Sequence, residues 1–126
     1  MIEQISTTDA PGAVGPYSQA IKAGGLLFVS GQLPIDPATG EFNSPNAVEQ
    51  AEQCLMNLQA IAKAAGTELS KTVKTTVLLT DLGDFSDINR IYASFFSTPY
   101  PARACCEVKA LPKGAKVEIE AVISLI

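Results

Sequence analysis

Arg103 is the first residue whose type and setting favour a chemical role. It follows Pro101 and Ala102, and because proline disfavours a helix interior, we expect Arg103 at or near the start of a strand. A guanidinium is planar and always charged, and it binds a carboxylate through two parallel hydrogen bonds. Many arginines make only loose surface ion pairs, but the flanking alanines and the expectation of a central strand favour anion binding here.

Two carboxylates near the C-terminus form a second candidate. Glu118 and Glu120 are two residues apart in an apolar stretch, so they share one face of the expected strand, while Val117, Ile119 and Ala121 share the other. A carboxylate on such a strand needs a partner or a role, because an isolated buried charge is costly. Exposure of both side chains to water at a sheet edge fits the pattern equally well.

The chain contains three cysteines and no histidine. The lack of histidine excludes Ser-His-Asp and Cys-His catalysis and removes the commonest zinc ligand. The cysteines lack CxxC spacing, and the side chains of adjacent Cys105 and Cys106 diverge in an extended segment. Without an activating histidine, plain core thiols are favoured over a nucleophile. Chemistry must come from carboxylates, arginine, hydroxyls, thiols, backbone groups and water.

Three polar positions interrupt apolar stretches. They are the segment Gly15–Gln19 with Tyr17, the segment Ser30–Gln32 with Ser30 and Gly31, and Asn89 on an expected helix. A glycine within a strand often marks a close approach of the backbone to another backbone or to a ligand. Turn geometry explains either break when it is taken alone, and Asn89 fits a cap-like bond as well as a ligand contact.

Composition narrows the class of protein. A hydrophobic fraction of 47% in 126 residues predicts one globular domain, residues 1–126. The net charge of −4 and the scattered basic residues argue against nucleic acid as the main partner. No apolar run reaches the roughly 18 residues that span a bilayer, and residues 1–4 lack the basic start of a signal peptide. We therefore expect a cytoplasmic protein without a membrane partner.

Periodicity predicts an α+β fold of order ββ-α-β-α-ββ, a mixed sheet with two helices on one face. The expected elements are a hairpin of strands 17–22 and 26–32, a helix from Asn46 to Gly66, a strand at 71–80, a helix from about Asp84 to Pro99, and a second hairpin of strands 103–109 and 117–125.

Two helices can cover only one face of this sheet. Residues 26–29, 77–79 and 122–123 are nevertheless apolar on both faces of their strands. The second face should therefore pack against sister subunits, because it would otherwise be a large exposed apolar patch. A long loop lying over that face is the alternative.

Taken together, these stretches resemble the Rid family, also called the YjgF family, of reactive-intermediate imine deaminases. The resemblance runs over nearly the whole chain. It is most specific in Pro101-Ala102-Arg103-Ala104-Cys105-Cys106-Glu107-Val108, Leu111-Pro112 and Val117-Glu118-Ile119-Glu120-Ala121, and it includes Gly15-Pro16-Tyr17-Ser18-Gln19 and Val29-Ser30-Gly31-Gln32.

The resemblance implies a chorismate-mutase-like fold and a homotrimer with three clefts between neighbouring subunits. The implied activity is hydrolysis of 2-imino acids, such as 2-iminobutanoate and 2-iminopropanoate, to 2-oxo acids and ammonia, without a cofactor or a metal. Arg103 would bind the substrate carboxylate, Glu118 would activate water, and the backbone at Cys105 would position the imino group or the water. Tyr17, Ser30, Gly31 and Asn89 would line the cleft.

Two other functions remain compatible with these residues. A trimeric binding module for small carboxylates would use the same arginine without chemistry. A ribonuclease that inhibits translation is an activity attributed to some relatives. The acidic net charge and the lack of histidine weigh against this second function, because RNA requires a basic surface and its cleavage usually requires an acid and a base.

Overall fold

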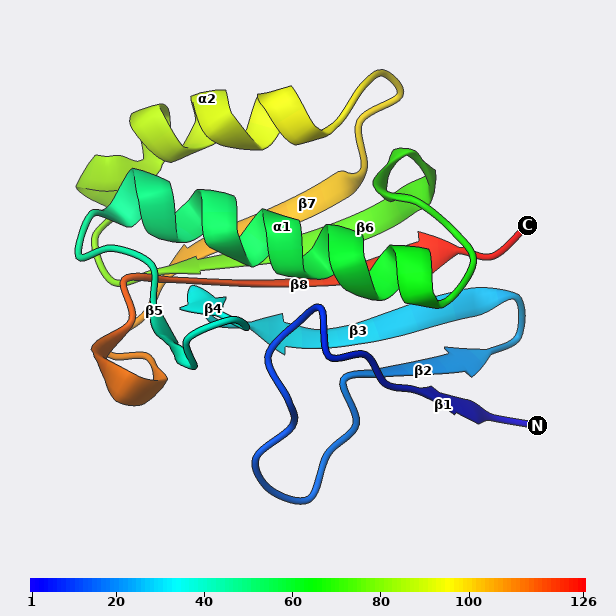
Figure 1. Cartoon of the computed structure of the whole chain (residues 1–126). Helices are drawn as coiled ribbons and strands as arrows, with labels where there is room; N and C mark the ends of the chain where they lie inside the picture. Colours follow the sequence, from blue (N-terminus) through cyan, green and yellow to red (C-terminus); the bar gives the residue numbers. More distant parts are fainter.

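A computed structural model describes all residues from 1 to 126. The strands are β1 (Glu3–Ile5), β2 (Ala20–Ala23), β3 (Leu26–Gln32), β4 (Ile35–Asp36), β5 (Glu41–Phe42), β6 (Thr72–Leu79), β7 (Ala102–Glu107) and β8 (Val117–Ser124), and the α-helices are α1 (Ala47–Ala64) and α2 (Phe85–Phe95). Both helices lie on one face of the main sheet (Figure 1). The predicted α+β class and the order ββ-α-β-α-ββ are confirmed, while the short strands β1, β4 and β5 were not predicted.

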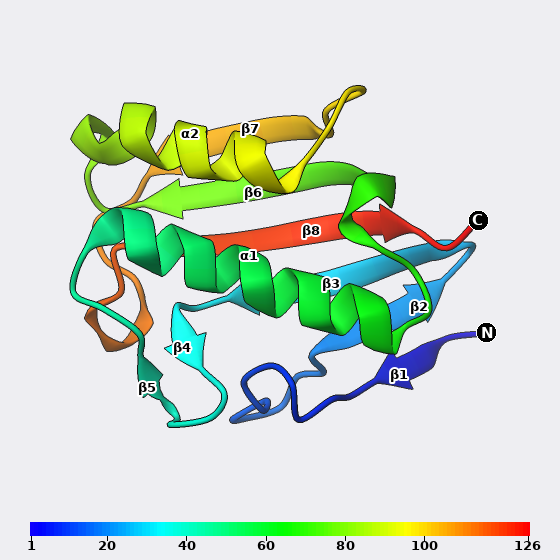
Figure 2. The same cartoon turned by 45° about the horizontal axis from the view of Figure 1, so that its top comes forward.

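The six strands of the main sheet lie in the order β1-β2-β3-β8-β6-β7. All neighbouring strands are antiparallel except β6 and β7, which are parallel. In the turned view, α1 crosses over β8 and β3, whereas α2 lies over β6 and β7 (Figure 2). None of the helices has the length and apolarity that crossing a membrane requires.

Helix α1 begins and ends where the sequence predicts. The Asn46 side chain accepts hydrogen bonds from the backbone N–H groups of Val48 and Glu49, at 2.9 and 3.3 Å, which satisfies two of the unpaired donors of the first turn. Just past the last turn, Gly66 has a φ of +83°, a conformation that favours glycine. The Glu49 carboxylate does not complete a capping box with the Asn46 N–H. It accepts from the Ser44 hydroxyl instead.

The predicted second hairpin is wrong, and so is the prediction that Arg103 lies on a central strand. Strand β7 is the edge strand beside β6, and β8 runs between β3 and β6. Burial explains this order, because the four helix-facing residues of β8 are at most 3% exposed, whereas most of β7 is exposed. Burial under α1 stabilises the apolar strand β8 more than it would stabilise β7, whose side chains are mostly small or polar.

The sheet face away from the helices is open in the chain. Phe28 on this face is 46% exposed, and Leu26, Leu78 and Val122 are partly exposed. On the helix face, Leu27, Val77 and Ile119 are at most 2% exposed. The helices therefore cover one face only, as predicted, and no loop of the chain buries the other.

Candidate active site

Glu118 lies on the open face of β8 and leans across Gly31 of β3. A Cβ atom built on Gly31 would collide with the Glu118 carboxylate. The φ angle of Gly31 is not in the left-handed region, so a larger residue here is opposed by the close approach of the Glu118 carboxylate, which would have to move, and not by backbone strain. A glycine within a strand was expected to mark a close approach, and here Gly31 lies against Glu118, the residue predicted to activate water.

A cavity of about 560 Å³ surrounds this contact. Tyr17, Ser30, Gly31 and Glu118 all line it, so the chain brings these four predicted site residues together, and we call them the glutamate half-site. Burial, and to a lesser extent the charge of Glu120, raises the pKa of Glu118 above its ordinary value. A raised pKa suits a carboxylate that exchanges protons near neutral pH.

Backbone contacts hold the loop that carries Tyr17. The Ser30 hydroxyl, on a residue that lines the cavity, donates to the Ser18 carbonyl at 2.6 Å. The buried Gln19 amide accepts from the Thr7 N–H at 2.7 Å and donates to the carbonyls of Thr7 and Pro11 at 3.0 and 2.7 Å. The Gln19 side chain therefore joins residues 7–11 to the start of β2.

Arg103 lies on β7 and faces α2. Its Nη1 donates to Asn89 Oδ1 at 2.7 Å, and its guanidinium carbon lies 5.3 Å from the ring centre of Phe85 and 4.8 Å from that of Tyr92. The three α2 residues are spaced by four and three positions, so they share one face of the helix. A second cavity, of about 440 Å³, is lined by Asn89, Tyr92 and Arg103, which we call the arginine half-site.

The backbone of Cys105 is available at the sheet edge. Val108 donates its N–H to the Leu79 carbonyl of β6, and the backbone groups of alternate residues point to opposite sides of a strand. The N–H and C=O of Cys105 therefore point away from β6, toward the open edge. The Cys105 side chain is half-buried, and this burial raises the pKa of its thiol, although the Arg103 charge lowers it. A protonated thiol is a weak nucleophile.

The two half-sites are separated within the chain. Arg103 is paired with Thr75 of β6, and Glu118 is paired with Leu78 of the same strand. The two residues are thus roughly 10 Å apart along the strands and roughly 10 Å apart across them. Arg103 faces the helices, whereas Glu118 faces away from them. One small molecule cannot contact both side chains of a single chain.

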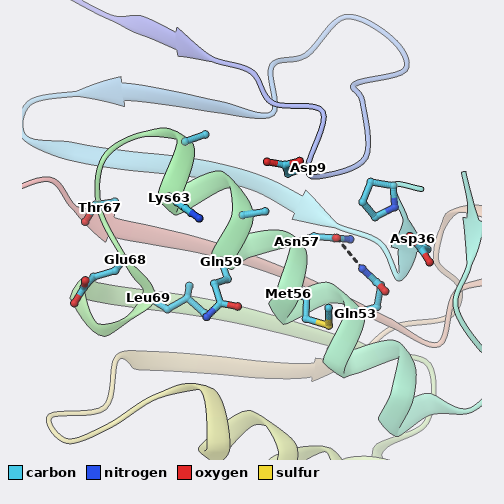
Figure 3. A pocket seen from close by; sticks show the side chains of 13 residues that line it. Asp9, Asp36, Gln53, Met56, Asn57, Gln59, Lys63, Thr67, Glu68 and Leu69 are labelled. Atoms are coloured by element: carbon cyan, nitrogen blue, oxygen red, sulfur yellow. Dashed lines mark hydrogen bonds between the residues drawn. The ribbon is translucent and has the colours of Figure 1, made fainter. Parts of the chain in front are cut away.

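The largest hollow of the surface lies elsewhere, along α1 (Figure 3). Its volume is about 950 Å³, and it contains none of the predicted site residues. At its floor, Gln53 donates to Asn57 Oδ1 at 2.9 Å, and Asn57 donates to the carbonyls of Leu33 and Ile35 at 3.1 and 3.0 Å. These amides connect α1 to the segment after β3, so we assign them a structural role and place the site at the half-sites.

No group of three or more cysteine and carboxylate side chains is arranged to hold a metal ion. The polar groups available to a small molecule at the two half-sites include the guanidinium of Arg103, the carboxylates of Glu118 and Glu120, the hydroxyls of Tyr17 and Ser30, and the backbone groups at the β7 edge.

Comparison with known proteins identifies the family. The family described as Endoribonuclease L-PSP matches residues 7–125. The crystal structure of RidA from an Antarctic Psychrobacter is 48% identical, covers 97% of this chain and 98% of that chain, and has a TM-score of 0.93. The chain belongs to the Rid family.

Two Rid-family relatives are also similar in sequence. A RutC family protein of Sinorhizobium fredii is 90% identical over 125 residues, which are 99% of each chain. The human protein named 2-iminobutanoate/2-iminopropanoate deaminase is 50% identical over 118 residues, which are 94% of this chain and 86% of that protein. The sequence resemblance to the Rid family is therefore confirmed.

Three contacts of this Rid-family site were not predicted from the sequence. Phe85 and Tyr92 lie in the segment that the sequence predicts only as a helix, from about Asp84 to Pro99, yet both contact the Arg103 guanidinium. Gln19 was noted within a polar break without a role. The spacing of Phe85, Asn89 and Tyr92 on one helix face is the signal that could have indicated the arginine contact, once α2 was placed over β7.

Proposed function

We propose that this Rid-family chain is a cytoplasmic homotrimeric enzyme that hydrolyses 2-imino acids, such as 2-iminobutanoate and 2-iminopropanoate. Water is consumed, the C=N bond is replaced by C=O, and the products are a 2-oxo acid and ammonia. The proposal rests on the two half-sites, which hold a carboxylate-binding group and a proton acceptor, and on relatives of about 50% identity that are named for this activity.

Arg103 would bind the substrate carboxylate. One of its five N–H groups is used by Asn89, and the aromatic rings lie against its face, which leaves donors at the guanidinium edge for a two-point contact. Because the electrophilic carbon is directly bonded to the carboxylate carbon, this contact fixes the carbon in space. Orientation of two reactants replaces a random encounter by a positioned reaction.

Glu118 would hold a water molecule and take its proton as the oxygen attacks the C=N carbon. Glu118 returns this proton to the imino nitrogen, giving a tetrahedral carbon that bears a hydroxyl and an amino group. Glu118 then takes the hydroxyl proton as the C=O bond forms and passes it to the amino nitrogen, so that the C–N bond breaks and ammonia leaves. The raised pKa of Glu118 supports both proton transfers, because a carboxyl group whose pKa lies closer to neutral pH can both accept and return a proton.

The outward backbone groups of Cys105 would position the imino group or the water. The raised pKa of the Cys105 thiol supports a role for the backbone and not for the sulfur. Tyr17, Ser30 and Gly31 would line the opposite side of the cleft, next to Glu118.

The observation that carries the proposal is the separation of the half-sites. Arg103 is on an edge strand, Glu118 is on the open sheet face, and the open face is partly apolar, with Phe28 exposed. In a closed ring of three chains, the edge of one chain would lie beside the open face of the next. Each cleft would then contain Arg103 and Asn89 from one subunit and Tyr17, Ser30, Gly31 and Glu118 from its neighbour.

A subunit-mixing experiment tests both the chemistry and the assembly. The imine is generated by an amino-acid dehydratase or oxidase, and its decay is followed with purified protein. Arg103→Lys retains the charge but loses the two-point contact, and Glu118→Gln retains the shape but cannot accept a proton, so each homotrimer should be nearly inactive. When both variants are unfolded together and refolded as a mixture, about a quarter of the clefts should contain both native residues and regain activity.

The other outcomes separate the rival functions. A mixture that stays inactive would place both residues of the site in one chain and contradict the inter-subunit cleft. Wild-type protein that binds 2-oxobutanoate without accelerating imine decay would be a binding module. Cleavage of single-stranded RNA that is lost in Glu118→Gln would favour the ribonuclease, an activity that the family description names.

A further inference from the structure

Arg103 has no acidic partner in the chain. The one salt bridge joins Arg90 and Asp87 on the exposed side of α2. Arg103 is held instead by the amide of Asn89 and by an aromatic platform, which consists of the rings of Phe85 and Tyr92. A mobile arginine would have to be ordered each time a carboxylate binds, and this ordering costs affinity.

Tyr92 makes two contacts at once. Its ring lies beneath the Arg103 guanidinium, and its hydroxyl is 2.6 Å from the Thr75 hydroxyl. Thr75 is the strand partner of Arg103 on β6 and is fully buried, at 0% exposure. The phenol is also buried, which raises its pKa and keeps it neutral. One side chain of α2 therefore contacts both of the neighbouring strands β6 and β7 at the same register position.

We propose that Thr75 and Tyr92 are positioning residues for the arginine of the active site. The buried hydrogen bond between their hydroxyls fixes the tyrosine ring, and the ring holds the Arg103 guanidinium ready for a carboxylate. This inference rests on the proposed function, in which Arg103 binds the carboxylate of the imino acid. The chain uses the aromatic platform in place of an acidic partner, because a glutamate or aspartate beside Arg103 would compete with the substrate.

The affinity of the protein for 2-oxobutanoate tests this proposal. Tyr92→Leu removes the ring and should raise the dissociation constant about three- to tenfold, which is the contribution of a partly desolvated cation–π contact. Thr75→Val and Tyr92→Phe each remove the hydrogen bond between the two hydroxyls, and each should raise the dissociation constant less than Tyr92→Leu does. Thr75→Ser retains the hydroxyl and should restore wild-type affinity.

Two comparisons separate positioning from a general loss of stability. The double variant Thr75→Val with Tyr92→Phe leaves neither hydroxyl unpaired, so it should bind no more weakly than either single variant. Ile61→Val shortens a buried side chain of α1 far from β7, and it should lower the melting temperature without changing the affinity. In turnover assays, KM should rise more than kcat falls.

Side-chain NMR gives a readout that does not depend on activity. The chain has two arginines, Arg90 and Arg103, so the spectrum should contain two Nε–Hε signals. In Tyr92→Leu the Arg103 signal should show increased fast motion, whereas Arg90, which is held by Asp87, should be unchanged. Equal motion and equal affinity in wild type and Tyr92→Leu would overturn the inference.

Three outcomes distinguish the positioning role of Thr75 and Tyr92 from the deaminase activity of the protein. Active wild-type enzyme that is inactivated by Arg103→Lys, but is indifferent to Tyr92→Leu and Thr75→Val, would contradict the positioning role alone. Wild-type protein without imine turnover, but with carboxylate binding that depends on Tyr92, would contradict the deaminase alone. Wild-type protein that binds no small carboxylate would contradict both.

Discussion

The half-buried position of Glu118, which we propose as the proton acceptor, has a cost in stability. Burial raises its pKa, so the folded chain binds the proton of this carboxyl more tightly than the unfolded chain does. The ionised form therefore destabilises the fold at a pH above the raised pKa. This cost disappears as the pH falls below the value of an unfolded glutamate, about 4.3.

Glu118→Gln should separate the two effects. At pH 7 we expect a melting temperature equal to or higher than that of the wild type, and the difference should close as the pH approaches 4. Imine turnover should fall on the order of 100-fold, because the amide cannot accept a proton. In the wild type, kcat/KM should decline toward acid with a midpoint above the ordinary glutamate pKa. A variant that is less stable than the wild type at pH 7 would contradict this account of the burial.

Gly31→Ala should disable the site without changing any chemical group. The new methyl would collide with the Glu118 carboxylate, which must then turn away from its water. A displacement of about 1 Å can cost about 100-fold in rate, so we expect a loss of that order in kcat. Gly83→Ala is the matched control, since its Cβ would also approach a carboxylate, that of Asp81, but outside both half-sites, and its activity should be that of the wild type.

Part of the candidate site could be predicted residue by residue. Tyr17, Ser30, Gly31 and Glu118 were predicted from motifs, and they line one cavity. The role of Phe85 and Tyr92 could not be predicted, because a helical stripe does not tell which strand lies beneath it. Their contact with Arg103 depends on the position of β7 at the sheet edge, which is a property of the tertiary fold.

The elements themselves were predictable from periodicity, whereas one pairing was not. Helix α1 agrees with the predicted helix from Asn46 to Gly66, and β6 agrees with the predicted strand at 71–80. The last two strands were expected to form a hairpin because they are neighbours in sequence. Proximity in sequence does not by itself decide strand pairing, and β8 buries more apolar surface between β3 and β6 than it would beside β7 at the sheet edge.

The loop before β2 depends on the buried Gln19 side chain. Its amide makes hydrogen bonds to backbone groups of Thr7, Ala10 and Pro11, and it is 3% exposed. Gln19→Ala would leave these groups unpaired and should lower the free energy of unfolding by about 2 kcal/mol. Hydrogen exchange of residues 7–17 should accelerate, and activity should fall because Tyr17 is carried by this loop.

Gln59→Ala is the control for Gln19→Ala. Gln59 is exposed on α1, so its replacement should change neither exchange nor turnover. Unchanged exchange of residues 7–17 in Gln19→Ala would show that the loop is held by other contacts.

The two faces of the layered fold should respond differently to an introduced charge. Phe28 on the open sheet face is 46% exposed, and Met56 on α1 is 47% exposed. If the open face packs against sister subunits, Phe28→Glu should give a 13.2 kDa monomer without deaminase activity, because a buried unpaired charge is costly. Met56→Glu should remain a trimer with full activity.

Sedimentation velocity at micromolar concentration distinguishes these assemblies. A wild-type monomer would remove the inter-subunit cleft, and a wild-type dimer would contradict the proposed assembly while keeping an interface on the open face. A Phe28→Glu variant that stays a trimer would place the interface on another surface.

The close approach of Glu118 to Gly31 imposes an order on evolutionary change. While the carboxylate lies across the glycine, any larger residue at position 31 collides with it. Substitutions at position 31 should therefore accumulate only after Glu118 has been replaced. A lineage that abandons the chemistry should therefore lose the acid first and the glycine second. Descendants that retain the glycine without the acid should exist, whereas the reverse combination should be absent or accompanied by a displaced β3. An alignment of inactive relatives can test this succession.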